Sequence, residues 1–206
     1  VIHHLYEDNQ VEIPDIISEC EKAGNPNLVY EFASTSKVSF PGSGIAAMAA
    51  SAENLADVKK QMTIQTIGYD KLNQLRHVAY FKNIDGLKAH MKKHADAMRP
   101  KFEAVLKVLD EELTGAEIGS WVKPLGGYFI SFETMEGCAK KIVAKCKEAG
   151  VTLTNAGATF PYGKDPKDSN IRIAPSFPTP EEMAVATDLF VLCVKLVSVE
   201  KLLENK

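Results

Sequence analysis

Residues 34–42 read Ser34-Thr35-Ser36-Lys37-Val38-Ser39-Phe40-Pro41-Gly42, so a lysine lies between hydroxyl side chains and a Pro-Gly turn. A lysine amine is protonated near neutral pH, and it attacks carbonyl groups only where its surroundings disfavour or share that charge. The hydroxyls of Ser34 and Ser36, with nearby backbone N–H groups, can hold a phosphate beside the amine. The stretch therefore indicates a lysine that presents its amine to a phosphorylated aldehyde. A solvated lysine in an ordinary turn is the alternative.

The preceding residues predict that this lysine follows a strand. Residues 28–33 read Leu-Val-Tyr-Glu-Phe-Ala, an alternation typical of a strand. Lys37 then lies just beyond the strand end. Strand ends are where α/β sheets bind ligands, so the position favours a functional lysine.

A second candidate, Arg172, lies in the apolar stretch Ile171-Arg172-Ile173-Ala174. A guanidinium in a strand of this kind needs an anion or a carbonyl partner, because burying it unpaired is costly. Its planar fork suits a carboxylate, and a structural salt bridge is the alternative. The adjacent Asn170 either supports such a site or makes surface hydrogen bonds.

Four segments of the chain, in this order, resemble motifs of the class I/II aminotransferases of the fold-type I group. The first is the lysine stretch, and the others are Pro124-Leu125-Gly126-Gly127-Tyr128-Phe129, Gly150-Val151-Thr152-Leu153-Thr154 with Gly157-Ala158-Thr159-Phe160, and Ser169-Asn170-Ile171-Arg172-Ile173-Ala174. Within the group the chain is most similar to the atypical bacterial aspartate aminotransferase branch. One departure is Gly44, which stands where many relatives carry an arginine to the cofactor phosphate.

This resemblance implies a set of roles. Lys37 would hold pyridoxal 5′-phosphate (PLP) as a Schiff base, Ser34 and Ser36 would contact its phosphate, and Arg172 with Asn170 would bind the substrate carboxylate. The implied reaction moves an amino group between an amino acid, aspartate or glutamate by the subgroup likeness, and a 2-oxo acid. A PLP-dependent decarboxylase remains open. The resemblance also implies a homodimer. A cytoplasmic location is expected from the residues themselves, because the longest apolar runs are interrupted by charge and the N-terminus has no basic region followed by an apolar stretch.

The resemblance further implies that the chain is the C-terminal half of a longer protein, because the family's other cofactor motifs precede the lysine. The expected fold class is α/β: a remnant of the large-domain sheet in residues 1–82, followed by a small α+β domain in residues 83–206. For such a half-length chain, a catalytically silent structural or association module is the competing hypothesis.

Periodicity and turn signals predict the individual elements. Strands are expected at 1–7, 28–33, 45–50 (buried), 128–132, 151–153 and 171–174. Helices are expected at 14–23, from a cap at Ser51, at 70–81, 87–113, 136–149 and 180–203. Pro100 should bend or restart the long helix. Thr179 should cap the last one.

Composition limits the classes of function that the chain can have. The 206 residues are 45% hydrophobic and 25% charged, with a formal charge of −3, which gives no general reason to bind nucleic acid or an anionic membrane. The four cysteines form no C-x-x-C pair, so reduced thiols are expected. His90 and His94 have a zinc-compatible spacing, but two lysines lie between them, and surface histidines without a metal are expected.

Overall fold

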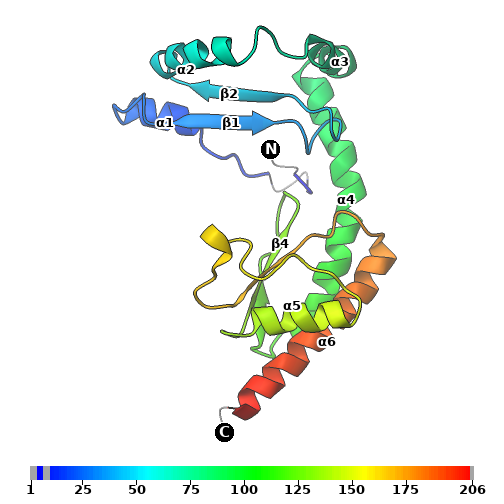
Figure 1. Ribbon diagram of the computed structural model, residues 1–206. Coiled ribbons are helices and arrows are strands. Elements are labelled where there is room, and N and C mark those ends of the chain that lie inside the picture. Colours follow the sequence, from blue (N-terminus) through cyan, green and yellow to red (C-terminus); the bar gives the residue numbers. More distant parts are fainter. Residues whose placement is uncertain (1–3, 7–9, 205–206) are drawn as a thin grey trace. The chain divides into compact units, whose positions relative to one another are not determined.

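The computed structural model describes residues 4–6 and 10–204 (Figure 1). The chain is an α/β structure that divides into two compact units, one up to His94 and one from Ala95 onward. This division falls within a long helix, whereas the sequence places a domain boundary at residue 83, just before that helix begins. The strand expected at residues 1–7 lies largely outside the described residues.

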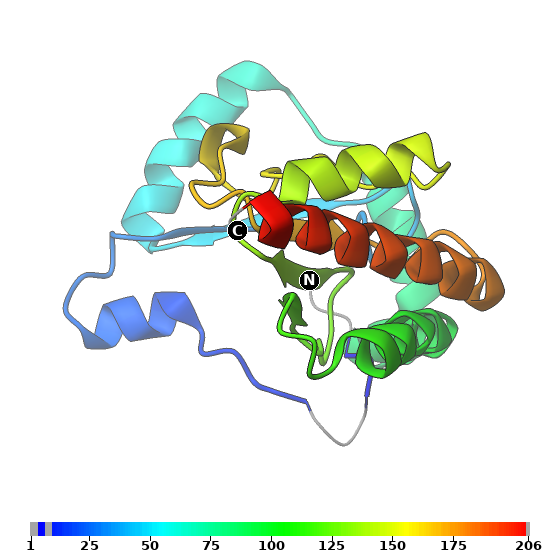
Figure 2. The same ribbon diagram turned by 90° about the horizontal axis from the view of Figure 1, so that it is seen from below.

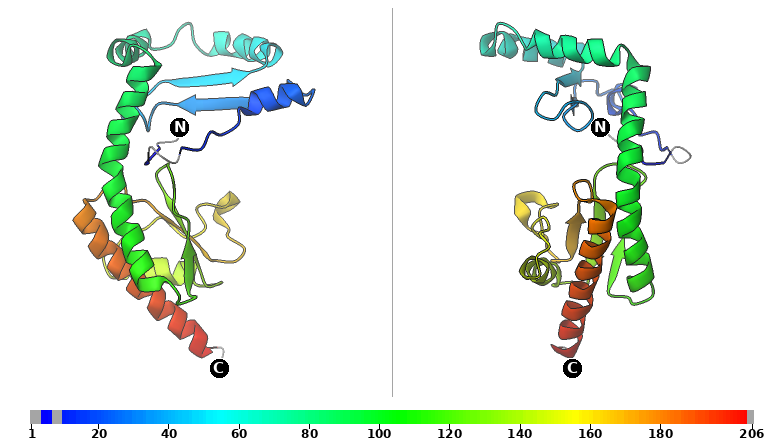
Figure 3. Two further views of the ribbon diagram at one scale, coloured as in Figure 1. Left: turned by 180° about the vertical axis from the view of Figure 1, so that it is seen from behind. Right: turned by 90° about the vertical axis from the view of Figure 1, so that its right-hand side faces the viewer.

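The first unit is built on a two-stranded antiparallel sheet. Strands β1 (Tyr30–Ser34) and β2 (Ala46–Ala50) pair with Tyr30 opposite Ala50 and Ser34 opposite Ala46. Three helices accompany the sheet, namely α1 (Ile16–Lys22), α2 (Ala52–Gln65) and α3 (Lys71–Phe81) (Figure 3). The side chains of Asp15, Ser51 and Asp70 accept backbone N–H groups at the helix starts, as good N-cap residues do.

Two features of this unit differ from the sequence pattern. Strand β2 was expected to be buried, but its residues are exposed or half-buried. Helix α3 buries Asn73, His77 and Phe81, which recur every four residues and therefore share one face. Its apolar Leu72 is 79% exposed. The buried face of this helix is thus mainly polar, and a hydrophobic pattern cannot predict it.

The second unit contains a three-stranded antiparallel sheet in the order β3 (Gly119–Trp121), β4 (Ile130–Thr134) and β5 (Asn170–Ile173). Helices α5 (Ala139–Glu148) and α6 (Pro180–Glu204) pack side by side (Figure 2). A short 3-10 turn, Pro161–Gly163, precedes β5. Helix α4 (Ile84–Leu113) contributes a buried apolar face from its C-terminal part, and it passes through Pro100 without restarting.

The core of the second unit is centred on Phe132 of β4, which is fully buried. Its ring stacks on Trp121 of β3 at 6.1 Å and meets Phe190 of α6 edge-on at 5.0 Å between centroids. A Cβ at Gly119 would lie 2.5 Å from this ring, so only glycine fits there. Alternate residues of β4 point inward, as expected for a strand with one buried face.

The strand expected at 151–153 does not form. Helix α5 ends with Gly150 at φ +97°, and the N–H of Val151 donates to the carbonyl of Cys146 at 2.8 Å. Together with the bond from Gly150 N–H to the Lys147 carbonyl, this is a Schellman motif, which ties Val151 to the helix end. All four cysteines are free, and burial raises the pKa of the Cys146 thiol to about 12, with Cys193 adding to the shift.

Candidate functional site

The lysine loop, residues 34–44, is a pair of tight turns that begins where β1 ends. The N–H groups of Val38 and Ser39 both donate to the carbonyl of Thr35, at 2.9 and 2.8 Å, and Lys37 lies in this first turn on the exposed surface. In the second turn Ser43 N–H donates to the Phe40 carbonyl at 3.0 Å. Pro41 and Gly42 occupy its centre, and the φ of +76° at Gly42 is that of a type II turn.

Two hydroxyl side chains lie close together just before Lys37 in the chain. Ser34 Oγ and Ser36 Oγ are 2.7 Å apart, and Ser36 N–H also donates to Ser34 Oγ at 3.2 Å. A Cβ at position 44 would lie 2.8 Å from Ser36 Oγ and 3.0 Å from its backbone nitrogen. The backbone at Gly44 therefore packs closely against Ser36, and a side chain at this position would collide with it.

Helix α3 holds the lysine loop at both ends through its buried polar face. Asn73 Nδ2 donates to the carbonyls of Ser43 and Gly44 at 2.8 and 3.1 Å. One turn further along the helix, His77 Nε2 lies 2.8 Å from Ser39 Oγ and 3.3 Å from Thr35 Oγ1. Thr35 Oγ1 in turn accepts the N–H of Ile45 at 2.9 Å, which closes the base of the loop.

Arg172 extends from β5 in the second unit and is half-buried. Its Nη2 donates to Thr154 Oγ1 at 3.3 Å, and its guanidinium lies 4.4 Å above the centre of the Phe129 ring. Its Nε is buried and has no hydrogen-bond partner. Among the residues that the structure describes, no carboxylate pairs with it.

The guanidinium lines a cavity of about 160 Å³. Apolar side chains of α6, including Met183 and Phe190, line it as well, and Thr154 lies beside the arginine. An arginine in such a cavity, with an unused N–H and no acidic partner, can receive a carboxylate from a ligand.

Asn170 lies next to Arg172 in sequence but belongs to a separate polar cluster. Its Nδ2 donates to Glu133 Oε1 at 2.6 Å and to Ser131 Oγ at 2.9 Å, while its Oδ1 accepts from Thr159 Oγ1. The whole side-chain amide is therefore engaged within the protein. The role predicted for Asn170 in substrate binding stays a prediction. The contacts of its side chain favour an indirect role, in which Asn170 holds β5 in place.

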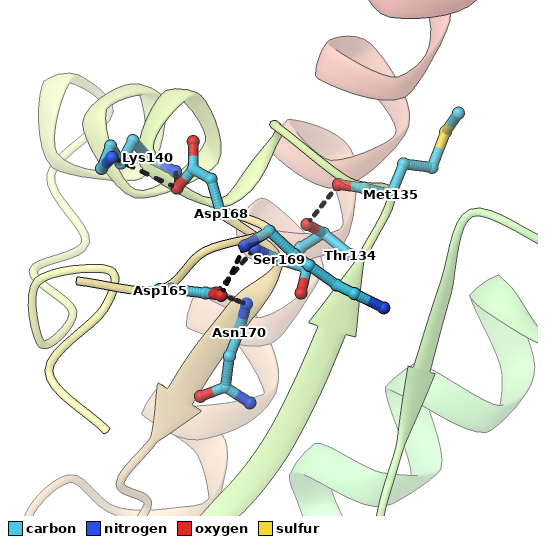
Figure 4. Close-up of polar contacts among 8 residues, drawn as sticks. Thr134, Met135, Lys140, Asp165, Asp168, Ser169 and Asn170 are labelled. Carbon is cyan, nitrogen blue, oxygen red and sulfur yellow. Dashed lines mark hydrogen bonds and ion pairs between the residues drawn. The ribbon is translucent and has the colours of Figure 1, made fainter. Parts of the chain in front are cut away.

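The loop before β5 is organised by Asp165 (Figure 4). Its Oδ2 accepts the N–H groups of Ser169 and Asn170, both at 2.8 Å, and its Oδ1 accepts that of Lys167 at 3.0 Å. Burial alone would raise the pKa of Asp165, but these backbone donors hold the pKa below its usual value.

Three residues that organise these sites, Asn73, His77 and Asp165, were not singled out from the sequence. The four-residue spacing of Asn73, His77 and Phe81 on a predicted helix was the available signal. Asp165 carries no such signal, because its donors become neighbours only once the loop is folded.

Other candidate features give no metal site. His90 and His94 do contact each other, Nε2 to Nε2, at 3.0 Å. Across the residues the structure describes, no group of three or more potential ligands gathers around them or elsewhere. None of the described helices is long and apolar enough to cross a membrane.

Comparison with known proteins matches the chain over its full length to one family. The sequence profile of the family described as aspartate amino-transferase covers residues 1–206. The aspartate aminotransferase of Corynebacterium glutamicum is 42% identical over 197 residues, which are 96% of this chain and 46% of that protein. The chain spans about half the length of the curated relatives it matches.

Solved structures show the same relationship. The crystal structure of an aspartate transaminase from Corynebacterium glutamicum superposes with a TM-score of 0.93 at 42% identity, over 97% of this chain and 47% of that one. An α-aminoadipate aminotransferase from Thermus thermophilus, in complex with N-(5′-phosphopyridoxyl)-L-leucine, shares the fold with a TM-score of 0.76 at 21% identity. The matched region covers 96% of this chain and 49% of the Thermus thermophilus chain.

We predict that, because of Asp165, the free energy of unfolding of the second unit decreases as the solution becomes acidic. Because the pKa of its carboxyl is lower in the folded state, its stabilisation is present above the unfolded value of about 3.9 and is lost as the pH falls through the folded value. Asp165→Asn should lower the free energy of unfolding at pH 7 by about 1–3 kcal/mol and flatten its acid dependence.

Urea denaturation between pH 3 and 7 measures this effect. Asp188→Asn is the control, since Asp188 is exposed on α6. Equal pH profiles for Asp165→Asn and the wild type would contradict the prediction.

Proposed function

The chain belongs to the aspartate aminotransferase family, and we propose that it is the half of a transaminase that carries the cofactor lysine. In this proposal the whole protein moves an amino group between an amino acid, aspartate or glutamate, and a 2-oxo acid. The observation that carries it is the half-buried Arg172, whose buried Nε has no hydrogen-bond partner and which forms no ion pair with a carboxylate of the described residues. The name of the Corynebacterium relative supports the choice of amino acid.

The lysine loop fits PLP. Lys37 is exposed on a tight turn, two hydroxyls lie 2.7 Å apart beside it, and Gly44 lets the backbone approach Ser36 closely. Ser34, Ser36 and Lys37 would hold the cofactor, through two hydroxyl contacts to the phosphate and a covalent bond at Lys37 Nζ. When bound, PLP stabilises negative charge at the α-carbon of the attached amino acid.

The chain's own residues would then have two tasks. Lys37 Nζ, as a free amine, would take the proton from the α-carbon of the amino acid and would give a proton back later in the transfer. Arg172 holds the α-carboxylate with its planar fork, and a fixed carboxylate sets which α-carbon bond is broken. Phe129 supports the guanidinium from one face, so its orientation is set before substrate arrives.

A second candidate is that the 206-residue chain alone is catalytically silent and acts as an association module. Large apolar side chains exposed in the first unit favour it, among them Phe32 at 75% and Leu72 at 79% exposure. An apolar surface of this kind usually marks an interface. A homodimer of the whole protein, with amino and 2-oxo acids as substrates, is part of the same proposal.

We predict that Lys37→Ala abolishes the visible absorption that PLP gains on forming an imine with the protein, and with it nearly all turnover of aspartate and 2-oxoglutarate. No other side chain can replace a covalent bond at this position. Lys60→Ala is the control, because Lys60 is an exposed lysine of α2. Retention of both signals in Lys37→Ala would overturn the proposed role. A wild-type chain that gains no such absorption would favour the association module.

For Arg172→Ala we expect weaker binding of aspartate by roughly 10- to 100-fold, because a charged hydrogen-bonded contact contributes about 1.5–3 kcal/mol. Arg172→Lys should recover only part of this affinity, since lysine lacks the planar fork. Aspartate titration of the PLP-loaded protein measures the effect. Wild-type affinity in both variants would contradict a carboxylate-binding role.

A further inference from the structure

The lysine loop depends on one buried imidazole. His77 lies on α3 and is only 5% exposed, and its two ring nitrogens both have partners. Nδ1 lies 2.9 Å from the carbonyl of Asn73 on its own helix, and Nε2 lies 2.8 Å from Ser39 Oγ in the loop. A histidine so placed joins the helix to the turn that contains Lys37.

The hydrogen-bond directions follow from the chemistry of the partners. A carbonyl oxygen only accepts, so Nδ1 carries a proton. In the neutral imidazole Nε2 is then an acceptor, and its nearest donor is the Ser39 hydroxyl at 2.8 Å. The same hydroxyl lies 2.9 Å from Thr35 Oγ1 and 3.1 Å from the Thr35 carbonyl, so His77 is the nearest of its three acceptors. Thr35 Oγ1, at 3.3 Å from both Nε2 and the Ile45 carbonyl, remains able to donate to that carbonyl.

This bond acts on the turn through Ser39. The backbone N–H of Ser39 donates to the Thr35 carbonyl at 2.8 Å, so the residue whose side chain binds His77 also closes the turn around Lys37. The next residue, Phe40, packs its ring edge-on against the imidazole at 5.2 Å. Near Lys37 the loop is therefore held to α3 by the hydrogen bond and the ring contact of His77, while Asn73 holds its far end at Ser43 and Gly44.

We infer that His77 is a positioning residue for Lys37, acting through Ser39 to fix the turn from which the lysine amine meets the cofactor. The inference rests on the proposed function of Lys37. It adds to that function a specific acceptor, His77 Nε2, without which the loop is held only by Asn73 and by packing. His77 itself contacts neither cofactor nor substrate in this account.

Two substitutions separate the acceptor from the ring. His77→Phe keeps an aromatic ring against Phe40 and removes both nitrogens. His77→Gln keeps a side-chain oxygen that can accept the Ser39 hydroxyl. Ser43→Ala is the matched control, since it removes a hydroxyl from the same loop that makes no hydrogen bond in the described structure.

The first measurement is amide hydrogen exchange at Val38 and Ser39 in the cofactor-free chain, with circular dichroism to verify folding. His77→Phe should exchange at these two amides about fivefold faster or more, because it removes a hydrogen bond of about 1 kcal/mol. His77→Gln should restore most of the protection, and Ser43→Ala should match the wild type. Equal exchange in His77→Phe and wild type, or no recovery in His77→Gln, would overturn the inference.

The second measurement is the PLP concentration at which half of Lys37 is modified after borohydride reduction. It should rise several-fold in His77→Phe and return toward the wild-type value in His77→Gln. An unchanged concentration in His77→Phe would overturn the inference. If the exchange results hold but the wild type shows no preference for Lys37, the proposed function falls and the support of the loop by His77 stands.

A double substitution tests whether the effect passes through Ser39. Ser39→Ala alone should speed exchange at Val38 at least as much as His77→Phe does, because it also removes the contacts of the Ser39 hydroxyl with the carbonyl and Oγ1 of Thr35. The double variant should add little to Ser39→Ala, because that change already removes the hydrogen bond to His77. Additive effects would show that His77 acts on the loop by another route, which would overturn the inference.

Discussion

The lysine loop is tied to α3 by buried hydrogen bonds to two polar side chains, and this constraint sets which face of α3 is buried. Val38 is buried and Phe40 stacks on Phe81, so apolar packing accompanies these bonds. The carbonyls and hydroxyls of the loop are bound by Asn73 and His77. Buried polar groups are costly unless paired, so each anchor needs its partner in place.

This requirement accounts for the unusual face of α3. A helix that packs by hydrophobic contact buries its leucines, whereas α3 buries an asparagine, a histidine and a phenylalanine and leaves Leu72, Leu75 and Val78 exposed. In the second unit an apolar core around Phe132 supports β5, and Asp165 binds the backbone at the start of that strand. Two different kinds of packing thus support the two candidate site residues, Lys37 and Arg172.

Much of this could be predicted from the sequence, and the remainder depended on contacts that no pattern encodes. Strand β1, the Pro-Gly turn and the caps at Ser51 and Thr179 follow from local signals, and Thr179 and Glu182 do exchange N-cap hydrogen bonds. Four short motifs predict the family, and the profile match over residues 1–206 confirms that prediction. The prediction of a strand at 151–153 was wrong because Gly150 ends α5 with a Schellman motif. The prediction that β2 is buried was wrong because a two-stranded sheet leaves its strands partly uncovered. Asn73 and His77 escaped notice because polar residues on a helix are ordinarily expected to face solvent.

The central claim, that this chain carries the cofactor lysine at position 37, is tested most directly by mapping where PLP attaches. The wild-type chain is incubated with PLP, reduced with borohydride and digested, and the modified lysines are identified by peptide mass spectrometry. The account predicts that Lys37 is labelled far ahead of the other exposed lysines. Label spread over the surface lysines, with no preference for Lys37, would contradict it.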